Sequence, residues 1–288
     1  MDQRLIDIHH DYVHHHFDRR RFLEEAGRIA GGATAAAALL PVLDCNFALA
    51  QTVADNDPRV TTQNVTFQGA TGEMKAYLAR PNDDARHPAV IVVHEIGGVS
   101  PHIQDVAKRL AVEGYVALAV DFLSPAGGTP APGQGGGPQR AQQLKPDETY
   151  ANGVEAVKYL RMRADVNGRV GIVGFCWGGR VVQHVAVREP TLNAAVAFYG
   201  QPPHPSEAAK LQAPLLMNYA DVMLDMNNGG EGILYAQELR RLGKNFEIQF
   251  YPGAQHGFNN DTNQARYNKA AADLAWSRTI AWFKQYLG

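Results

Sequence analysis

The fold predicted for this chain is decided by one stretch, Val170-Gly171-Ile172-Val173-Gly174-Phe175-Cys176-Trp177-Gly178-Gly179. Its apolar, β-branched start is typical of a buried strand, and the apolar residues of 181–187 have the spacing of a helix. A G-x-S-x-G turn between a strand and a helix holds a nucleophile on a strained bend, and here Cys176 stands in place of serine. The partial positive charge at a helix N-terminus favours thiolate over thiol. The stretch therefore predicts that Cys176 is a nucleophile.

Short apolar runs of the same kind lie on both sides of this stretch, and segments with helical spacing separate them. This alternation indicates crossover units and a mostly parallel central sheet with helices on both faces. The expected strands are 88–94, 116–120, 170–173, 194–198 and 214–217, and the last helix is expected at about 263–286. Two earlier segments, 64–67 and 74–78, predict an antiparallel hairpin at the start of the sheet. Residues 51–288 are thus expected to form one domain with the α/β-hydrolase fold.

A cysteine nucleophile needs a base and a group that orients the base. His256 precedes the last expected helix and lies in a loop flanked by glycine, from which an imidazole can reach the turn at Cys176. In this fold the chain order is nucleophile, acid, base, so the acid should follow the strand at 214–219. Two carboxylates lie there, Asp221 and Asp225, and either one could hold the His256 tautomer. The backbone N–H of Trp177 is a candidate oxyanion-hole donor.

Composition and charge exclude several classes of protein. The chain has 288 residues, 45% of them hydrophobic and 19% charged, which excludes a disordered tail or a disulfide-stapled mini-domain. A net charge of −2 gives no basic field for nucleic acid or anionic lipid. The sequence has no phosphate-binding G-x-x-x-x-G-K-[ST] loop, no H-E-x-x-H motif and no cysteine pair suited to zinc, so we expect no cofactor and no metal.

The first fifty residues have the pattern of an export signal. Arg19-Arg20-Arg21-Phe22-Leu23 precedes an uncharged stretch at 33–43, and Ala48-Leu49-Ala50 closes the segment. The paired arginines resemble a twin-arginine signal, which implies the twin-arginine export machinery as a partner, cleavage after Ala50 and a periplasmic or otherwise exported protein. No membrane contact is then expected after cleavage, although a retained anchor is the alternative. Cys45 and the histidines of 9–16 would leave with the signal.

Several blocks of this sequence together resemble the dienelactone hydrolase family, over roughly Val65 to Gly288. The blocks are GFCWGG at 174–179, HEIGG at 94–98, YPGAQHGF at 251–258 and AWSRTIAWF at 275–283. The resemblance implies an α/β-hydrolase in which Cys176 is the nucleophile and His256 the general base. By the same resemblance, Glu95 helps to generate the thiolate and the Ile96 N–H is the second oxyanion donor. Tyr199 corresponds to a substrate-binding pocket tyrosine.

The sequence departs from the family pattern at the acid and at two arginines. Counting from the preceding strand places the family aspartate at Met223, whereas counting back from the His256 block places it at Asp225. We favour Asp225, with Asp221 second and a missing acid third. The family arginines that clamp a substrate carboxylate are absent, since 121–125 reads DFLSP and residue 260 is Asn.

Two functional hypotheses follow. The first is a hydrolase of carboxylic esters or lactones that works through a Cys-His-Asp triad and a thioester intermediate. The second is a catalytically weak periplasmic ligand-binding or interaction protein on the same fold. The natural substrate and the oligomeric state stay open. The stretch from Ser124 to Pro138, SPAGGTPAPGQGGGP, is expected to lack regular structure.

Overall fold

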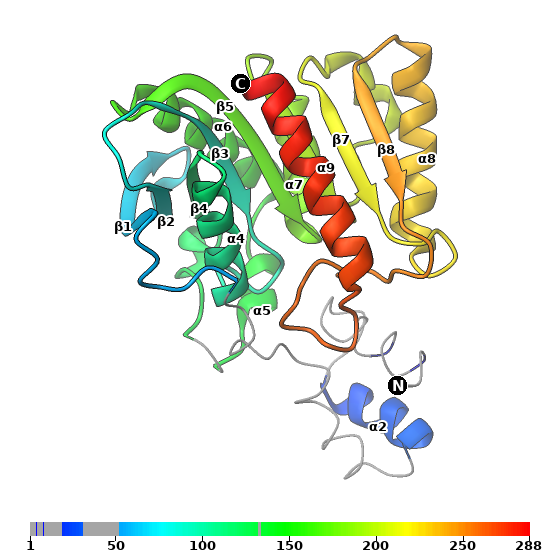
Figure 1. Ribbon diagram of the computed structural model, residues 1–288. Helices are drawn as coiled ribbons and strands as arrows, with labels where there is room; N and C mark the ends of the chain where they lie inside the picture. The colour runs from blue at the N-terminus through cyan, green and yellow to red at the C-terminus, as the bar shows by residue number, and fades with distance from the viewer. Residues whose placement is uncertain (1–3, 5–7, 9–18, 31–51, 132–133) are drawn as a thin grey trace.

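A computed structural model describes residues 4, 8, 19–30, 52–131 and 134–288. Within its N-terminal part, the paired arginines lie in helix α2 (Arg19–Ala30; Figure 1). The uncharged stretch at 33–43, Cys45, the cleavage site after Ala50 and the histidines of 9–16 lie outside the described residues. In the part of the chain that the structure describes, no helix is long and apolar enough to span a bilayer. The export signal stays a prediction.

One eight-stranded sheet forms the centre of the molecule, with the strand order β1-β2-β4-β3-β5-β6-β7-β8. The hairpin β1–β2 is antiparallel, and β2 pairs antiparallel with β4. Every other neighbouring pair is parallel. The strands are β1 (Val60–Gly69), β2 (Gly72–Pro81), β3 (His87–Val93), β4 (Val116–Asp121), β5 (Val166–Phe175), β6 (Ala194–Phe198), β7 (Leu215–Tyr219) and β8 (Phe246–Phe250). The expected hairpin and the mostly parallel sheet are confirmed.

Helices cover both faces of the sheet and bury a separate apolar core on each (Figure 1). Side chains of α6, α7 and α8 pack into one core, and side chains of α4 and α9 pack into the other. These helices are α4 (Pro101–Val112), α6 (Pro146–Met162), α7 (Trp177–Ala186), α8 (Met226–Arg241) and α9 (Lys269–Leu287). A short 3-10 helix, η3 (Pro205–Lys210), lies between β6 and β7. The α/β-hydrolase prediction is therefore confirmed.

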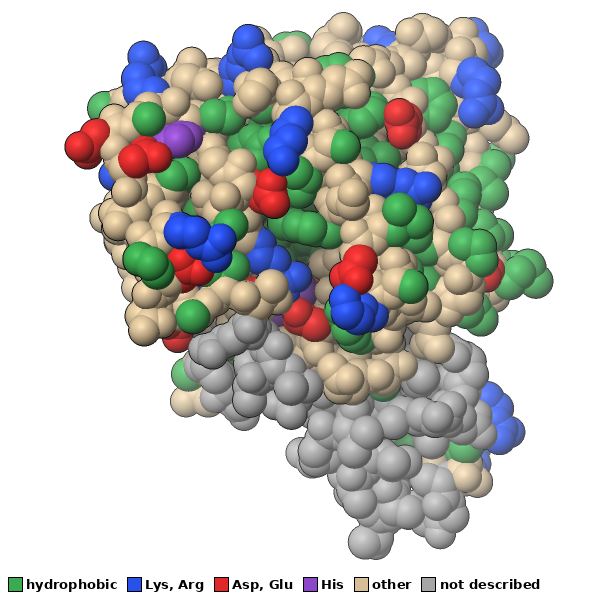
Figure 2. Space-filling view, viewed as in Figure 1, with side chains coloured by type: hydrophobic (Ala, Val, Ile, Leu, Met, Phe, Trp, Pro, Cys, Tyr) green, Lys and Arg blue, Asp and Glu red, His purple; other side chains and the backbone are tan. Residues whose placement is uncertain are grey.

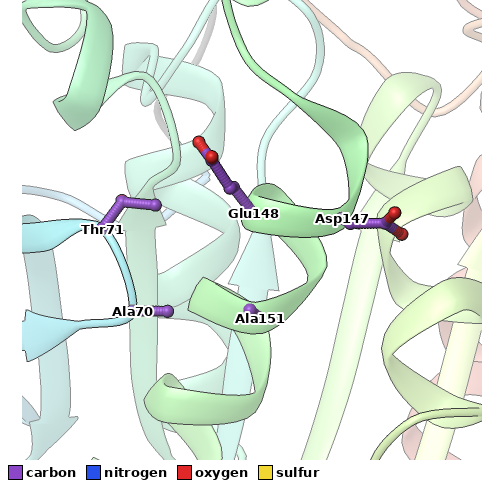
Figure 3. Close-up of a pocket in the computed structure, with 5 residues that line it drawn as sticks. All are labelled: Ala70, Thr71, Asp147, Glu148 and Ala151. Atoms are coloured by element: carbon purple, nitrogen blue, oxygen red, sulfur yellow. The ribbon is translucent and has the colours of Figure 1, made fainter.

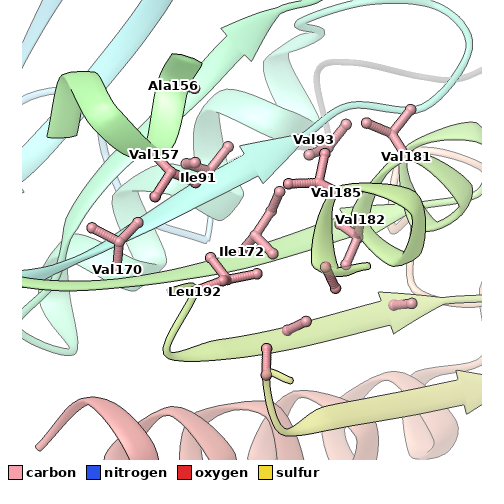
Figure 4. Packing of buried hydrophobic residues seen from close by; sticks show 14 of the residues in the cluster. Ile91, Val93, Ala156, Val157, Val170, Ile172, Val181, Val182, Val185 and Leu192 are labelled. Atoms are coloured by element: carbon pink, nitrogen blue, oxygen red, sulfur yellow. The ribbon is translucent and has the colours of Figure 1, made fainter. Parts of the chain in front are cut away.

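The burial of strand β3 on both faces explains why its sequence is apolar from Pro88 to Val93. Ile91 and Val93 point into the core shared with α6 and α7 (Figure 4), while Val90 and Val92 point into the opposite core. All four side chains are fully buried. Burying one such side chain stabilises the fold by about 1.5–3 kcal/mol, so a polar residue would be costly on either face. The continuous apolar run thus fixes a central, doubly covered strand, and Glu95 follows where that strand ends.

The Gly- and Pro-rich stretch after β4 differs from the expectation. Its two ends form short helices, η2 (Ser124–Ala126) and α5 (Gly137–Gln142), each with a proline in its first turn. Proline is tolerated there because the first-turn N–H groups have no partner within the helix. The Asp121 carboxylate also accepts hydrogen bonds from the backbone N–H groups of Leu123 and Thr129. The prediction of no regular structure was therefore wrong at both ends of the stretch.

The surface of the molecule carries both charges. In Figure 2, Lys and Arg side chains are interspersed with Asp and Glu side chains on the face shown. This mixing agrees with a net charge of −2 and gives that face no broad field of one sign.

Candidate active site

Cys176 lies on the strained bend between β5 and α7. Its φ of 56° and ψ of −118° are rare for a residue with a side chain, and such strain is maintained only where surrounding contacts fix it. Backbone hydrogen bonds hold both sides of the bend. The Cys176 N–H donates to the Phe198 carbonyl at 3.0 Å, and the Arg180 N–H donates to the Cys176 carbonyl at 3.2 Å. Cys176 itself is 8% exposed.

Close backbone approaches explain the glycines around this bend. A Cβ on Gly174 would lie 2.4 Å from the Gly178 carbonyl oxygen. A Cβ on Gly178 would lie 2.4 Å from the Val93 carbonyl oxygen, and one on Gly179 the same distance from that of Phe198. Backbone atoms cannot give way as a flexible side chain can. The bend therefore packs α7 directly against the ends of β3 and β6, and only glycine fits these positions.

His256 lies in the loop between β8 and α9, where its ring forms an ion pair with Asp225. Its Nδ1 is 2.9 Å from Asp225 Oδ2, and both side chains are largely buried. Asn228, in the first turn of α8, donates to Asp225 Oδ1 at 2.8 Å. No role for Asn228 follows from the sequence, and the one signal that could have indicated it is its position three residues after Asp225. Among the three alternatives for the acid, the structure pairs Asp225 with the imidazole.

Asp221 has a different environment. Its carboxylate accepts hydrogen bonds from the backbone N–H groups of Met223 and Gly253, at 2.9 and 2.8 Å. These bonds lower the pKa of the Asp221 carboxyl. They also tie the loop after β7 to the loop after β8, so Asp221 holds together the two segments that carry Asp225 and His256. Met223, where one count placed the family acid, is largely exposed.

The charges around His256 favour its protonated form. Burial alone would lower the pKa of His256, but the charges of Cys176 and Asp225 and hydrogen bonds with both raise it to about 10. Burial likewise opposes ionisation of Asp225, yet His256 and Asn228 keep its pKa below the usual value. The arrangement therefore stabilises an imidazolium between a thiolate and a carboxylate, which is the charge state in which a cysteine is nucleophilic.

Glu95 lies beside this pair, on the loop that follows β3. Its Oε2 accepts a hydrogen bond of 2.6 Å from the Nδ2 of Asn260. Burial raises the pKa of Glu95, His102 and His256 lower it, and the neighbouring charge of Cys176 raises it further, with a net upward shift. The structure thus brings Glu95 within electrostatic reach of both Cys176 and His256.

The two expected oxyanion donors, Trp177 and Ile96, lie beside one fixed histidine. Trp177 is the first residue of α7, so its N–H has no acceptor within the helix. Its ring stacks on His94 with centroids 5.3 Å apart. His94 Nε2 accepts from the Phe122 N–H at 3.1 Å, and its Nδ1 is 2.5 Å from the Glu95 carbonyl. Because a carbonyl can only accept, Nδ1 carries the proton, and His94 holds the Ile96 loop against Trp177.

Tyr199 is fully buried at the end of β6 and has a positive φ of 38°. Its ring centroid is 5.0 Å from that of His256 and 5.2 Å from that of Phe258. Burial raises the pKa of Tyr199 well above its usual range, and the charges of Glu95 and Cys176 add to this shift. The hydroxyl is therefore neutral, and the ring forms a wall beside the imidazole.

Two surface hollows lie on the face of the sheet that α6 covers. Cys176 lines neither of them. An open hollow of about 530 Å³ separates the β1–β2 turn from the start of α6 (Figure 3), with Asp147 and Glu148 among its lining residues. A smaller one of about 150 Å³ is bounded by Trp177 and Arg180 of α7 and by Tyr150 of α6. The second adjoins the bend through Trp177, so it is the better placed to take part of a substrate. Within the described residues, no three His, Cys, Asp or Glu side chains are grouped as a metal would require.

Comparisons with known proteins find relatives that match most of this chain. The profile of the "Dienelactone hydrolase family" matches residues 74–287. A provisionally named carboxymethylenebutenolidase of Salmonella typhi is 36% identical over 242 residues, which cover 75% of this chain and 84% of the relative. A provisionally named 2-oxo-3-(5-oxofuran-2-ylidene)propanoate lactonase of a Bradyrhizobium species is 34% identical, covering 76% of this chain and 92% of the relative. A crystal structure of a provisionally named dienelactone hydrolase from Klebsiella pneumoniae superimposes with a TM-score of 0.70 at 32% identity, covering 79% of this chain and 99% of that one.

Proposed function

Since the chain belongs to the dienelactone hydrolase family, we propose that it hydrolyses carboxylic esters or lactones through a covalent thioester on Cys176. The observation that carries this proposal is the buried His256, which interacts with both Cys176 and Asp225. A thiolate is the nucleophilic form of cysteine, and this pair stabilises it. Glu95 lies beside the same sulfur, where an ionised carboxylate repels a thiolate but can accept the proton of a thiol.

In the first half of the reaction, the Cys176 thiolate attacks the substrate carbonyl carbon and a C–S bond forms. The negative charge that develops on the carbonyl oxygen is stabilised by the N–H groups of Ile96 and Trp177. As the intermediate collapses, the C–O bond to the leaving group breaks, and the His256 imidazolium donates its proton to the departing oxygen. With a lactone, the new hydroxyl stays tethered to the acyl group.

In the second half, neutral His256 accepts a proton from water as the water oxygen attacks the thioester carbon. The C–S bond then breaks, the carboxylic acid leaves, and Cys176 is again a thiolate beside imidazolium. Asp225 keeps the imidazole in one tautomer and orientation throughout, as a triad carboxylate does. Tyr199 forms one wall of the site. Every step of this cycle uses groups of the protein, the substrate and water.

The lactone part of the proposal draws on the relative that is named a lactonase. A dienelactone is a less supported substrate, because DFLSP at 121–125 and Asn260 replace the arginines expected to bind its carboxylate. A simple ester or lactone without that charge makes no such demand. The proposal therefore covers the hydrolysis of esters and lactones, and it does not include recognition of a substrate carboxylate.

Titration with p-nitrophenyl acetate tests the reaction. A rapid burst of nitrophenol, stoichiometric with enzyme, followed by slower turnover is expected if a thioester forms. The burst should vanish in Cys176→Ala, whose folding is checked by circular dichroism. A folded wild-type protein that gives no burst and no turnover, on this ester and on simple lactones, would instead favour the ligand-binding alternative.

We also propose that residues 1–50 are an export signal of the twin-arginine type and that the protein is periplasmic or otherwise exported. The support is the sequence from Arg19 to Ala50. Fractionation of cells that express the full chain tests this. The wild type should be found processed outside the cytoplasm, whereas Arg19→Lys/Arg20→Lys should remain inside and unprocessed. Equal export of both would contradict the proposal.

A further inference from the structure

Asn260 has a side chain that can be oriented in only one way. It is 3% exposed, and its Oδ1 accepts hydrogen bonds from the backbone N–H of Thr262 at 3.0 Å and from the Thr262 hydroxyl at 2.6 Å. A backbone N–H is an obligatory donor, so the amide oxygen must face Thr262. The Nδ2 group must then face Glu95, to which it donates at 2.6 Å.

This polarity favours the ionised form of Glu95. An amide nitrogen only donates, so Glu95 Oε2 has to accept, and the ionised carboxylate is the form that accepts best. Burial acts in the opposite direction and raises the pKa of Glu95. The Asn260 amide, together with His102 and His256, thus favours the charged form of a carboxyl group whose burial favours the neutral form.

The turn that carries Asn260 is anchored to helix α4 by the next residue. Asp261 Oδ1 is 2.8 Å from His102 Nδ1, and Asp261 Oδ2 accepts from Arg109 at 2.6 Å. Arg109 also donates to Asp105 at 2.5 Å. His102 and Asp105 are fully buried, and the side chains of Arg109 and Asp261 are largely buried, so this network is mostly shielded from solvent. The network thereby fixes the position of residues 260–262 relative to the loop that carries Glu95.

We propose that Asn260 is a positioning residue for Glu95: its locked amide fixes the carboxylate beside Cys176 and keeps it ionised. The inference rests on the proposed function, because only an ionised Glu95 can accept the proton of Cys176 molecules that are in the thiol form and so help to generate the nucleophilic thiolate. Four titratable groups face Glu95, namely Cys176 at the bend, His256 in the loop after β8, His102 on α4 and Tyr199 at the end of β6. Asn260 differs from them because it stays neutral at every pH.

If Asn260 has this role, its removal should shift the acidic limb of the kcat/KM pH profile to higher pH. Without the Asn260 bond the carboxylate loses a favourable partner, so the pKa of Glu95 rises and the acidic limb of kcat/KM moves to higher pH. For Asn260→Ala we expect kcat/KM to fall about tenfold near pH 6, the size of one lost hydrogen bond to a charged group, and to approach the wild-type value near pH 9. Asn260→Asp should move the limb further, because it places a second carboxyl beside the first.

The decisive experiment measures four pH profiles on one neutral ester: wild type, Asn260→Ala, Glu95→Gln and the double variant. If Asn260 acts through Glu95, adding Asn260→Ala to Glu95→Gln changes nothing further. A uniform loss of kcat/KM at every pH, an unmoved limb, or an equal effect on the Glu95→Gln background would overturn the inference. If Asn260→Ala does not fold, Thr262→Val removes one of the two hydrogen bonds that hold the amide oxygen and leaves the bond from the residue 262 N–H, so it should displace the limb in the same direction by a smaller amount.

Two controls separate this inference from its premise. Gln264→Ala removes an exposed side chain that donates to the Asp261 carbonyl in the same loop, and it should leave the limb in place. A wild-type burst that Cys176→Ala abolishes establishes the proposed function by itself. If that burst is present and the limb in Asn260→Ala does not move, the positioning role fails while the proposed function stands.

Discussion

Asp225 Oδ2 lies 2.9 Å from His256 Nδ1, although 31 residues separate the two along the chain. Asp225 is the residue immediately before helix α8, and His256 lies in the loop after β8. The parallel pairing of β7 with β8 brings these two loops to the same edge of the sheet. The carboxylate therefore reaches the imidazole because of strand order.

This contact predicts that Asp225, and not Asp221, is the acid required for catalysis. Asp225→Asn should lower kcat by roughly 10³–10⁴-fold, because the amide allows the wrong His256 tautomer. Asp221→Asn is the matched control, as Asp221 bonds only backbone N–H groups among its described contacts and should retain kcat within about threefold of wild type at a modest cost in stability. Steady-state kinetics on an activated ester distinguishes the two. A large loss in Asp221→Asn alone would reverse the assignment.

Protonated His256 should stabilise the fold in a defined pH range. Its pKa rises from 6.5 to about 10 on folding, so its contribution is fully present below about pH 6.5 and is lost as pH rises towards 10. The difference in unfolding free energy between wild type and His256→Gln should thus be larger near pH 6.5 than near pH 10. Urea denaturation at both pH values measures it. A constant difference for His256→Gln at the two pH values would contradict the ion pair.

The bend at Cys176 should be intolerant of a single methyl group. Gly174→Ala would bring a Cβ within 2.4 Å of the Gly178 carbonyl oxygen, so we expect a loss of about 3 kcal/mol in stability together with activity. Gly230→Ala is the opposite case, because Gly230 lies inside α8 and an added Cβ would have open space around it within 4 Å. That change should be neutral or stabilise by up to about 1 kcal/mol. Thermal unfolding compares the two.

The α4 network should also contribute to stability. Arg109→Met would leave Asp105 and Asp261 without their shared cation, and removing one member of a buried ion pair costs about 3–5 kcal/mol. Arg241→Ala removes a comparable ion pair with Glu238 from the exposed surface of α8, where solvent screens it, and no resolvable change is expected. Denaturant unfolding of both variants is the measurement. Equal effects would show that the network is not shielded from solvent.

Local sequence patterns were sufficient to predict the fold and to propose two members of the candidate site. The apolar run of β3 predicts a strand covered on both faces, because a polar side chain buried there would be costly. The glycines around Cys176 predict a tight bend, because a Cβ at those positions would collide with backbone atoms. The loop position of His256 followed from the chain order of the fold. The Gly- and Pro-rich stretch was misjudged at its ends because its prolines occupy first-turn positions, where proline is compatible with a helix.

The sequence by itself determined the strand–bend–helix unit, the parallel sheet and the candidate pair of Cys176 and His256, since each depends on neighbours within a few residues or on chain order. Only the tertiary structure decided which carboxylate faces the imidazole and what holds Glu95. The contacts from Asp225 to His256 and from Asn260 to Glu95 join segments 31 and 165 residues apart. Their distances depend on how loops from different strands meet at one edge of the sheet, and no local pattern of residues encodes that.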